Sequence, residues 1–343
     1  MILSVSPRPR KGRPDPRRSR SETLILDGGL ATELEADGFD LNHPLWSAKV
    51  LIERPEAVRA VHARFLAAGA DCVISATYQA SFPGLARYGL SDRESEQLLR
   101  LAVELAAEER DRFWRDAANR EGRRRPLVAA SVGPYGAFLA DGSEYTGDYR
   151  ADDAGLAAFH WRRLDLLARS GADLLAIETI PSARESRVLR RLLDRLDDPP
   201  PAWVSFTCRD GGHLSDGTPV EEAAADLADC ARVRWVGVNC TPPKHLAALV
   251  PKFRAAAGKP AVAYPNGDGR WDPVRKVWET PAETADLPEL ALEWQRLGAD
   301  LVGGCCRTRP ADIRDIRGAL VPDAGLAACG ETPVSAESGE APG

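Results

Sequence analysis

The chain has 343 residues, of which 44% are hydrophobic and 28% are charged, and its formal net charge is −6. This length can bury a large core and suits one large α/β domain or two smaller ones. The absence of any run of about 18 apolar residues argues against a transmembrane helix. Residues 1–20 carry a net charge of +6 and leave −12 for the remainder, and so acidic a body argues against a broad nucleic-acid surface.

Both ends of the chain are predicted to be disordered. Residues 1–21 are basic and rich in Pro and Arg, without the apolar region of a secretory signal. Residues 322–343 are rich in Ala, Gly, Ser, Glu and Pro and have no periodicity. The seven cysteines are an odd number and are scattered along the chain. Without an export signal, this favours reduced thiols and a cytoplasmic protein over a disulfide framework.

Between these tails, residues 22–321 alternate between apolar segments and amphipathic helical ones. Strands are predicted at residues 24–27, 71–77, 127–132, 173–178, 202–207, 235–239, 261–264 and 300–302. Helices are predicted at residues 55–68, 92–119, 152–170, 220–231, 245–257, 287–297 and 311–320, with a further one capped by Ser182. Eight such units in about 300 residues predict a single-domain (β/α)8 TIM barrel. A doubly wound open sheet is the alternative, although no GxGxxG motif follows the first strand.

A short repeat supports regular strand–helix units. The tripeptide Gly-Ala-Asp recurs at residues 69–71, 171–173 and 298–300, each time between a helix and a strand. Glycine suits the left-handed position that ends many helices. We therefore expect the same local turn at all three places.

The carboxyl ends of the predicted strands are rich in functional groups. Active sites of (β/α)8 barrels lie at this end of the strands. The polar residues there are Asp27, Thr77, Glu178, Thr207, Asn239, Cys240, Asn266, Cys305 and Cys306. We predict substrate contacts from Thr77, its neighbour Tyr78, and Asn239, in addition to the cysteines and carboxylates described next.

Three cysteines stand at two of these strand ends and are predicted to hold a zinc ion. Cys240 ends the sixth strand, and Cys305 and Cys306 end the eighth, after Gly303 and Gly304, which are expected to let the backbone turn. Three thiolates on zinc leave one position open, as in catalytic sites. The alternatives are buried cysteines that only pack and a redox disulfide between the two adjacent cysteines, which would be strained and lacks CxxC spacing.

Two carboxylates could bind the ammonium group of an amino-acid substrate. Asp27 precedes Gly28 and Gly29 at the end of the first strand, and Glu178 ends the fourth. The backbone N–H groups of the two glycines could receive the substrate carboxylate. Helix capping or loop bracing is the alternative role for both acids. A set of loop aromatics could line the path of a cationic ligand: Trp46, Tyr78, Phe82, Tyr135, Tyr145, Trp271 and Trp278.

These segments resemble the homocysteine S-methyltransferases, in particular the branch that uses S-methylmethionine or S-adenosylmethionine. The matching segments are LDGGLATEL (26–34), SATYQAS (75–81), GPYGA (133–137), ADGSEY (140–145), ETIP (178–181), GVNC (237–240), YPNG (264–267) and GGCC (303–306). The resemblance implies a (β/α)8 barrel, zinc on the three cysteines, homocysteine as methyl acceptor and methionine as product. Betaine-using relatives share the cysteine triple, but residues 140–149 and 265–273 resemble the sulfonium-using branch more.

The expected reaction is attack of a homocysteine thiolate on the methyl group of a sulfonium donor. The thiolate, not the thiol, is the nucleophile, and coordination to zinc deprotonates a thiol. A betaine-type methyltransferase and a non-catalytic zinc or thiol-sensing barrel are the alternatives; the latter would need a fourth protein ligand, and none is evident. An aldolase or hydrolase would need Lys or His at a strand end, where none is found. No nucleic-acid or membrane partner is expected, and the sequence does not predict the oligomeric state.

Overall fold

The computed structural model describes residues 23–267, 270–272, 277–279 and 285–321. The two predicted tails, 1–21 and 322–343, lie outside the described residues, as does Cys329. Among the helices that are described, none is both long enough and apolar enough to cross a membrane.

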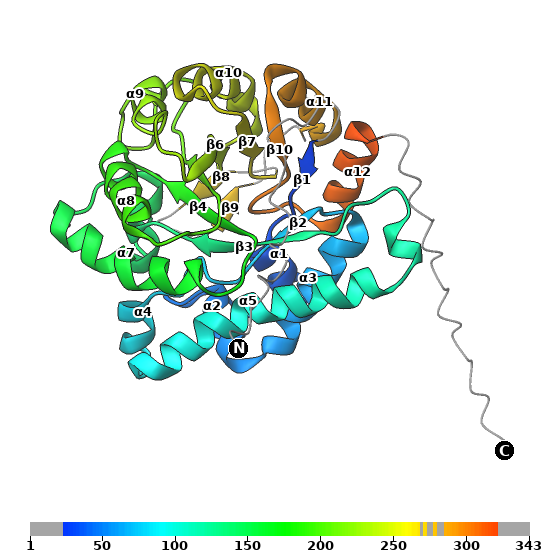
Figure 1. Ribbon diagram of the computed structural model, residues 1–343, viewed down its shortest axis with the longest axis horizontal. Helices are drawn as coiled ribbons and strands as arrows, with labels where there is room; N and C mark the ends of the chain where they lie inside the picture. Colours follow the sequence, from blue (N-terminus) through cyan, green and yellow to red (C-terminus); the bar gives the residue numbers. More distant parts are fainter. Residues whose placement is uncertain (1–22, 268–269, 273–276, 280–284, 322–343) are drawn as a thin grey trace, which may run out of the picture.

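Eight parallel strands form a nearly closed barrel with helices around it (Figure 1). Their order around the barrel is β1-β10-β7-β6-β5-β4-β3-β2. Two backbone hydrogen bonds join the ends of the series: Asp71 N–H donates to Ile25 O (2.7 Å) and Asp27 N–H to Cys72 O (3.0 Å). The strands are β1 (Leu24–Ile25), β2 (Cys72–Ile74), β3 (Leu127–Val132), β4 (Leu174–Ile180), β5 (Ala202–Phe206), β6 (Val233–Asn239), β7 (Ala261–Tyr264) and β10 (Ala299–Val302). The predicted (β/α)8 fold is confirmed, and the open-sheet alternative is wrong.

The predicted helices all form, with shifts at some ends. The helices are α1 (Leu30–Ala36), α2 (Ser47–Glu53), α3 (Pro55–Ala68), α4 (Phe82–Arg87), α5 (Asp92–Arg115), α6 (Tyr135–Leu139), α7 (Asp153–Ala168), α8 (Ala183–Arg195), α9 (Val220–Ala225), α10 (Leu246–Ala257), α11 (Leu287–Leu297) and α12 (Pro310–Leu320). Helix α9 ends six residues before the predicted 231. Helices α1, α2, α4 and α6 were not predicted, because five to seven residues are too few to establish a periodicity. An antiparallel pair, β8 (Arg270–Asp272) and β9 (Val277–Glu279), was also not predicted.

The aspartate of the Gly-Ala-Asp repeat has a structural role at the amino-terminal end of the barrel. Asp71 accepts the N–H of Ile25 (3.2 Å) and pairs with Arg317 (2.9 Å). Asp173 accepts the N–H of Val128 (2.9 Å) and pairs with Arg110 (2.7 Å). The first two copies of the repeat therefore fasten the start of one strand to its neighbour and to an outer helix, far from the carboxyl ends of the strands.

Side chains from alternate positions fill the barrel interior. This inner cluster includes Leu24, Leu26, Cys72, Ala129, Leu174, Ala176, Trp203, Val262, Tyr264 and Leu301. A second and larger cluster packs the outer faces of the strands against the helices. The strands are thus apolar on both faces, which explains their continuous apolar sequences.

Buried His62 makes stability depend on pH. It lies on α3, is fully buried, and neither ring nitrogen has a hydrogen-bond partner among the described residues. Burial, assisted by the charge of Arg59, lowers the pKa of His62 to about 4. As pH falls, the imidazole is therefore protonated in the unfolded chain before it is protonated in the folded one. The free energy of unfolding keeps its full value above about pH 6.5 and decreases by about 3 kcal/mol between there and about pH 4.

Urea unfolding of the wild type and of His62→Leu between pH 7 and pH 4 measures this effect. The free energy of unfolding is expected to fall less steeply with acidification in the variant, because Leu cannot take up a proton. Parallel pH profiles for the two proteins would contradict the assignment.

Candidate active site

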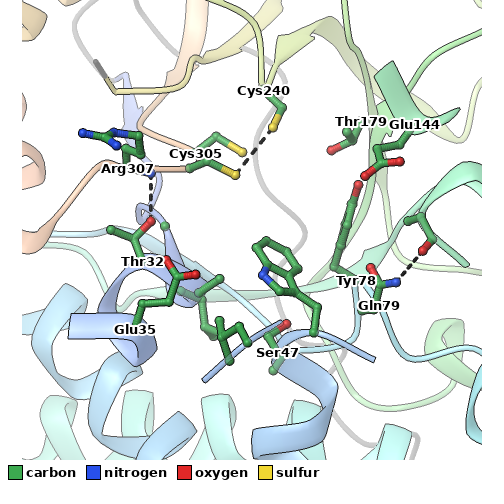
Figure 2. Close-up of a pocket in the computed structure, with 18 of the residues that line it drawn as sticks. Thr32, Glu35, Ser47, Tyr78, Gln79, Glu144, Thr179, Cys240, Cys305 and Arg307 are labelled. Atoms are coloured by element: carbon green, nitrogen blue, oxygen red, sulfur yellow. Dashed lines mark hydrogen bonds between the residues drawn. The ribbon is translucent and has the colours of Figure 1, made fainter. Parts of the chain in front are cut away.

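A cavity of about 590 Å³ opens at the carboxyl ends of the barrel strands. Its walls come from segments that follow β1, β2, β3, β6 and β10, together with residues at the carboxyl ends of β4 and β7. Figure 2 shows sulfur atoms on one side and the side chains of Tyr78, Glu144 and Thr179 on the opposite side. The cavity thus lies where a barrel of this type carries its active site.

Cys240, Cys305 and Cys306 meet in this cavity. Their sulfur atoms all lie within 4.8 Å of one another, and the Sγ atoms of Cys240 and Cys306 are 3.7 Å apart. Strands β6 and β10, which carry them, both pair with β7, so only one strand separates them. The sequence prediction that these three residues come together is therefore realised.

The turns that present the sulfurs use left-handed backbone at non-glycine residues. Cys240 has a φ of 49° and Arg307 a φ of 63°, a conformation that costs side-chain-bearing residues free energy and is common at functional sites. The N–H of Cys305 donates to Pro265 O (2.7 Å), and that of Cys240 to Tyr264 O (3.3 Å). Both cysteines are therefore tied to the end of β7 or to the residue after it.

Gly303 and Gly304 have a different role from the one predicted. Neither adopts left-handed backbone. A Cβ atom on Gly303 would lie 2.6 Å from the Cβ of Leu26, and one on Gly304 would lie 2.2 Å from Oγ1 of Thr308. The two glycines are needed for close approach of β10 to β1 and to the following turn, not for an unusual turn of their own.

Hydrogen bonds among the three thiols shift their pKa values in opposite directions. Hydrogen bonds from Cys305 and Cys306, and one from the Tyr145 hydroxyl at 3.6 Å, lower the pKa of Cys240. The same contacts with Cys240 raise the pKa values of Cys305 and Cys306. A metal ion that takes all three as thiolates must therefore displace protons, as thiolate sites generally do.

Two buried carboxyl groups line the cavity beside the cysteines. Asp27 is 2% exposed; its Oδ2 accepts the N–H of Ile74 (2.8 Å), while its Oδ1 has no hydrogen-bond partner among the described residues. Glu178 accepts hydrogen bonds from Ser131 Oγ and from Tyr264 Oη (3.0 Å). Burial raises the pKa of Asp27 well above its usual range and that of Glu178 to about 7. Both groups therefore gain from a cationic partner.

Two of the predicted substrate contacts do not line the cavity, and a third group is already bonded to protein. Thr77 is fully buried, and its hydroxyl donates to Ser131 O (2.7 Å). Asn239 is also fully buried; its Oδ1 accepts the N–H of Thr179 (2.8 Å), and its Nδ2 lies 3.8 Å from Cys305 Sγ. Neither lines the cavity, whereas Gly28 and Tyr78 do. The N–H of Gly29, expected to receive a carboxylate, instead donates to Thr308 O (3.0 Å).

Only some of the predicted loop aromatic residues line the cavity. Trp46, Tyr78 and Tyr145 line the cavity, and the rings of Trp46 and Tyr78 meet edge to face at 6.2 Å. Phe82 and Tyr135 do not line it. The side chains of Trp271 and Trp278 lie outside the described part of the chain.

Several lining residues were not singled out from the sequence. They are Thr32, Glu35, Gln79, Glu144 and Arg307. Glu144 sits in a short 3-10 turn, Ser143–Tyr145, rather than at a strand end, and Thr32 and Glu35 lie on unpredicted α1. A search restricted to strand ends could not have found them, although Glu144 lies within the segment ADGSEY that carried the resemblance.

The comparisons with known proteins agree with this geometry. A family model described as homocysteine S-methyltransferase matches residues 24–320. The chain is 45% identical over 293 residues to homocysteine S-methyltransferase YbgG of Bacillus subtilis, covering 85% of this chain and 93% of that protein. It is also 45% identical to a selenocysteine Se-methyltransferase of Brassica oleracea over 306 residues, covering 87% and 88% of the two chains. The metallated form of the homocysteine methyltransferase MmuM from Escherichia coli superposes with a TM-score of 0.75 at 42% identity, covering 87% of this chain and 96% of that one.

Proposed function

Because this chain belongs to the homocysteine S-methyltransferase family, we propose that its cysteine cluster holds zinc and that its methyl donor is a sulfonium compound. The enzyme transfers a methyl group to homocysteine. The observation that carries the proposal is the meeting of three sulfurs and two buried carboxyl groups in one cavity.

The residues present fit a zinc ion. Three sulfur ligands within 4.8 Å of one another form a soft donor set, which favours zinc over hard cations such as magnesium. The metallated form of the E. coli relative is consistent with a metal here. When bound by Cys240, Cys305 and Cys306, zinc would offer an open position for the homocysteine sulfur and keep that sulfur a thiolate near neutral pH.

Asp27 and Glu178 suit the ammonium group of homocysteine. Both are almost fully buried, both line the cavity beside the sulfurs, and Oδ1 of Asp27 has no partner among the described residues. A buried carboxyl group without a cation is costly, and an ammonium ion would offset that cost. These two side chains would therefore orient the amino-acid part of the acceptor and direct its sulfur toward the cysteines.

The wall of the cavity that adjoins Cys240 suits a cationic methyl donor. We call Tyr78, Glu144 and Tyr145 the donor wall, because all three line the cavity. Figure 2 shows Tyr78 and Glu144, and the hydroxyl of Tyr145 lies 3.6 Å from Cys240 Sγ. Aromatic rings and a carboxyl group attract a positively charged sulfonium centre, as in S-methylmethionine or S-adenosylmethionine. Transfer of the methyl group from this cation to a thiolate neutralises charge, so a cavity walled by aromatic rings that excludes water favours the reaction.

Methionine formation from homocysteine and each of three donors tests the donor assignment. We expect methionine from S-methylmethionine or S-adenosylmethionine, and none above background from betaine. Elemental analysis of the same preparation should give about one zinc per chain, and chelation should abolish turnover until zinc is restored. Methionine formed from betaine alone would contradict the sulfonium proposal.

A further inference from the structure

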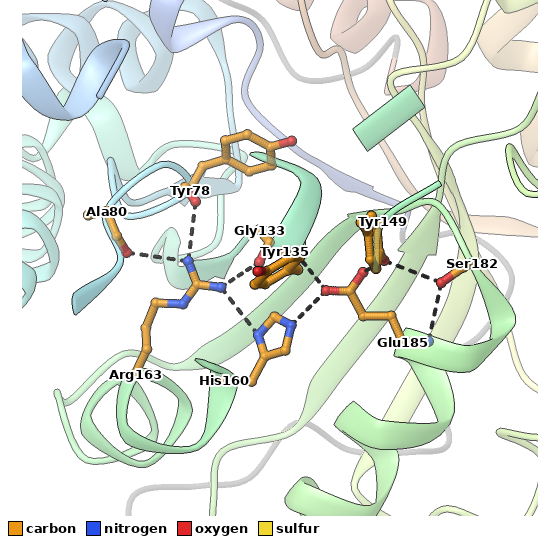
Figure 3. Close-up of polar contacts among 9 residues, drawn as sticks. All are labelled: Tyr78, Ala80, Gly133, Tyr135, Tyr149, His160, Arg163, Ser182 and Glu185. Carbon is orange, nitrogen blue, oxygen red and sulfur yellow. Dashed lines mark hydrogen bonds and ion pairs between the residues drawn. The ribbon is translucent and has the colours of Figure 1, made fainter. Parts of the chain in front are cut away.

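A buried arginine lies directly behind the donor wall. Arg163 on α7 is 1% exposed, and its guanidinium group contacts backbone carbonyls of two different loops (Figure 3). It donates to the carbonyls of Tyr78 (3.4 Å) and Ala80 (3.3 Å) after β2 and to that of Gly133 (2.5 Å) after β3. Burial lowers the pKa of Arg163 to about 10, which leaves it charged at neutral pH. A fixed cation thus holds together the two loops that follow neighbouring strands.

His160 and Glu185 extend this contact to α8. The guanidinium of Arg163 also donates to Nδ1 of His160 (3.3 Å), and Nε2 of His160 lies 2.7 Å from Oε1 of Glu185. Since arginine has no acceptor, Nδ1 must accept and Nε2 must carry the proton given to Glu185. Both His160 and Glu185 are fully buried. A cation and an anion are thereby connected through one neutral ring, and the charge of each is balanced inside the fold.

Glu185 connects the network to the segment before Glu144. Its Oε1 also accepts the N–H of Tyr135 (2.6 Å) at the start of α6, and its Oε2 accepts the hydroxyl of Tyr149. The next residue, Gly136, packs so tightly that a Cβ atom there would lie 2.4 Å from the backbone nitrogen of Glu144. The position of α6 therefore determines where Glu144 can lie.

Gly133 provides a second and independent connection, between Arg163 and the ring of Tyr78. A Cβ atom on Gly133 would lie 2.6 Å from Tyr78 O and 2.8 Å from Cδ2 of its ring. Arg163 binds the carbonyls of both residues. The ring of Tyr78 is consequently set by backbone on which Arg163 acts directly.

We propose that Arg163, His160 and Glu185 are positioning residues that hold the donor wall in place beside the cysteines and so determine methyl-donor affinity. The inference rests on the proposed sulfonium donor site. The cysteines follow β6 and β10, whereas the network acts on the segments after β2 and β3 and on α8, so donor binding and metal binding should respond separately to its loss. No member of the network lines the cavity, so none of them is a catalytic residue.

Steady-state kinetics on purified, zinc-loaded enzyme tests this separation. The variants are Arg163→Met, His160→Leu and His160→Gln. In His160→Leu the KM for the sulfonium donor is expected to rise by about tenfold, the effect of one lost buried hydrogen bond or more. Zinc content and the affinity for homocysteine are expected to stay within about twofold of wild type. His160→Gln, whose amide can still donate to Glu185, should recover part of the loss.

Two further variants keep the test decisive if Arg163→Met does not fold. Tyr149→Phe removes one hydroxyl, which bonds to Glu185 and Ser182, from a half-buried ring and should raise the donor KM by about 3-fold. Arg162→Met is the matched control: its side chain is 42% exposed on the same helix and pairs with Asp92 and Glu96. It should leave all three quantities unchanged.

The possible outcomes separate the two proposals. An unchanged donor KM in His160→Leu and Tyr149→Phe, or an equal loss of zinc, homocysteine affinity and donor affinity, would overturn the positioning role while leaving the sulfonium assignment intact. A wild-type enzyme that accepts no sulfonium donor would overturn both. A selective rise in donor KM with partial recovery in His160→Gln supports the inference.

Discussion

Replacement of Cys306 with alanine is expected to abolish both zinc binding and methyl transfer. Two sulfurs cannot hold the ion in the way three do, and removal of a direct ligand should exceed the approximately 10- to 100-fold loss that follows removal of a group behind a ligand. We expect the same result for Cys240→Ala and Cys305→Ala, because the three sulfurs lie within 4.8 Å of one another. Elemental analysis and a methionine assay on each purified variant measure the two effects.

Cys230→Ala is the matched control for this experiment. Cys230 is also a buried free thiol, but its Sγ lies 3.7 Å from Asp194 and outside the cavity. This variant should retain full zinc content and turnover. A Cys306→Ala enzyme with full zinc and full activity would remove that residue from the metal site.

Glu178→Gln is expected to weaken homocysteine binding by about 10- to 100-fold, the worth of a hydrogen bond to a charged group. The substitution keeps the size of the side chain and can keep its contacts with Ser131 and Tyr264, but it removes the charge that would face the substrate ammonium. Calorimetry on the zinc-loaded enzyme measures the affinity. The analogue 4-mercaptobutanoate, which lacks the amino group, serves as the control ligand.

The two ligands distinguish an ammonium contact from a general disturbance. Glu178→Gln should leave the affinity for 4-mercaptobutanoate unchanged, and equal losses for both ligands would contradict the ammonium contact. The pH dependence provides a further check, because burial raises the pKa of Glu178 to about 7. As pH falls below 7 the wild-type carboxylate is protonated, so its advantage over the variant for homocysteine should shrink; it should be largest near pH 8, where the carboxyl is ionised and the substrate ammonium still carries its proton.

Local patterns in the sequence were sufficient to predict the barrel. Helices α3 and α11 begin and end at the predicted residues, because proline at or near their first turns and glycine after their last mark both ends. The strands were found from their apolar runs, since strands buried on both faces need apolar residues throughout. The position of the cysteines at two strand ends followed from the same assignment.

Contacts between residues far apart in the sequence could not be predicted from such local patterns. The N–H of Gly29 is engaged by Thr308, 279 residues away, and the carbonyl of Gly133, in the loop after β3, is engaged by Arg163 on α7. Asn239 was expected in the cavity because it ends a strand, but its amide is held by Thr179. Which partner a polar group takes depends on distances that only the folded chain defines.

The sequence by itself therefore determined the fold class and the clustering of three cysteines at one end of the barrel, because both follow from periodicity and from position along a strand. Only the tertiary structure decided which polar groups face the cavity and which are already bonded to protein. It also revealed that Gly303 and Gly304 serve close packing, and that Arg163, His160 and Glu185 connect the loops behind the donor wall. The physical reason is that hydrogen bonds and close approaches join residues far apart in the chain, and no local pattern records them.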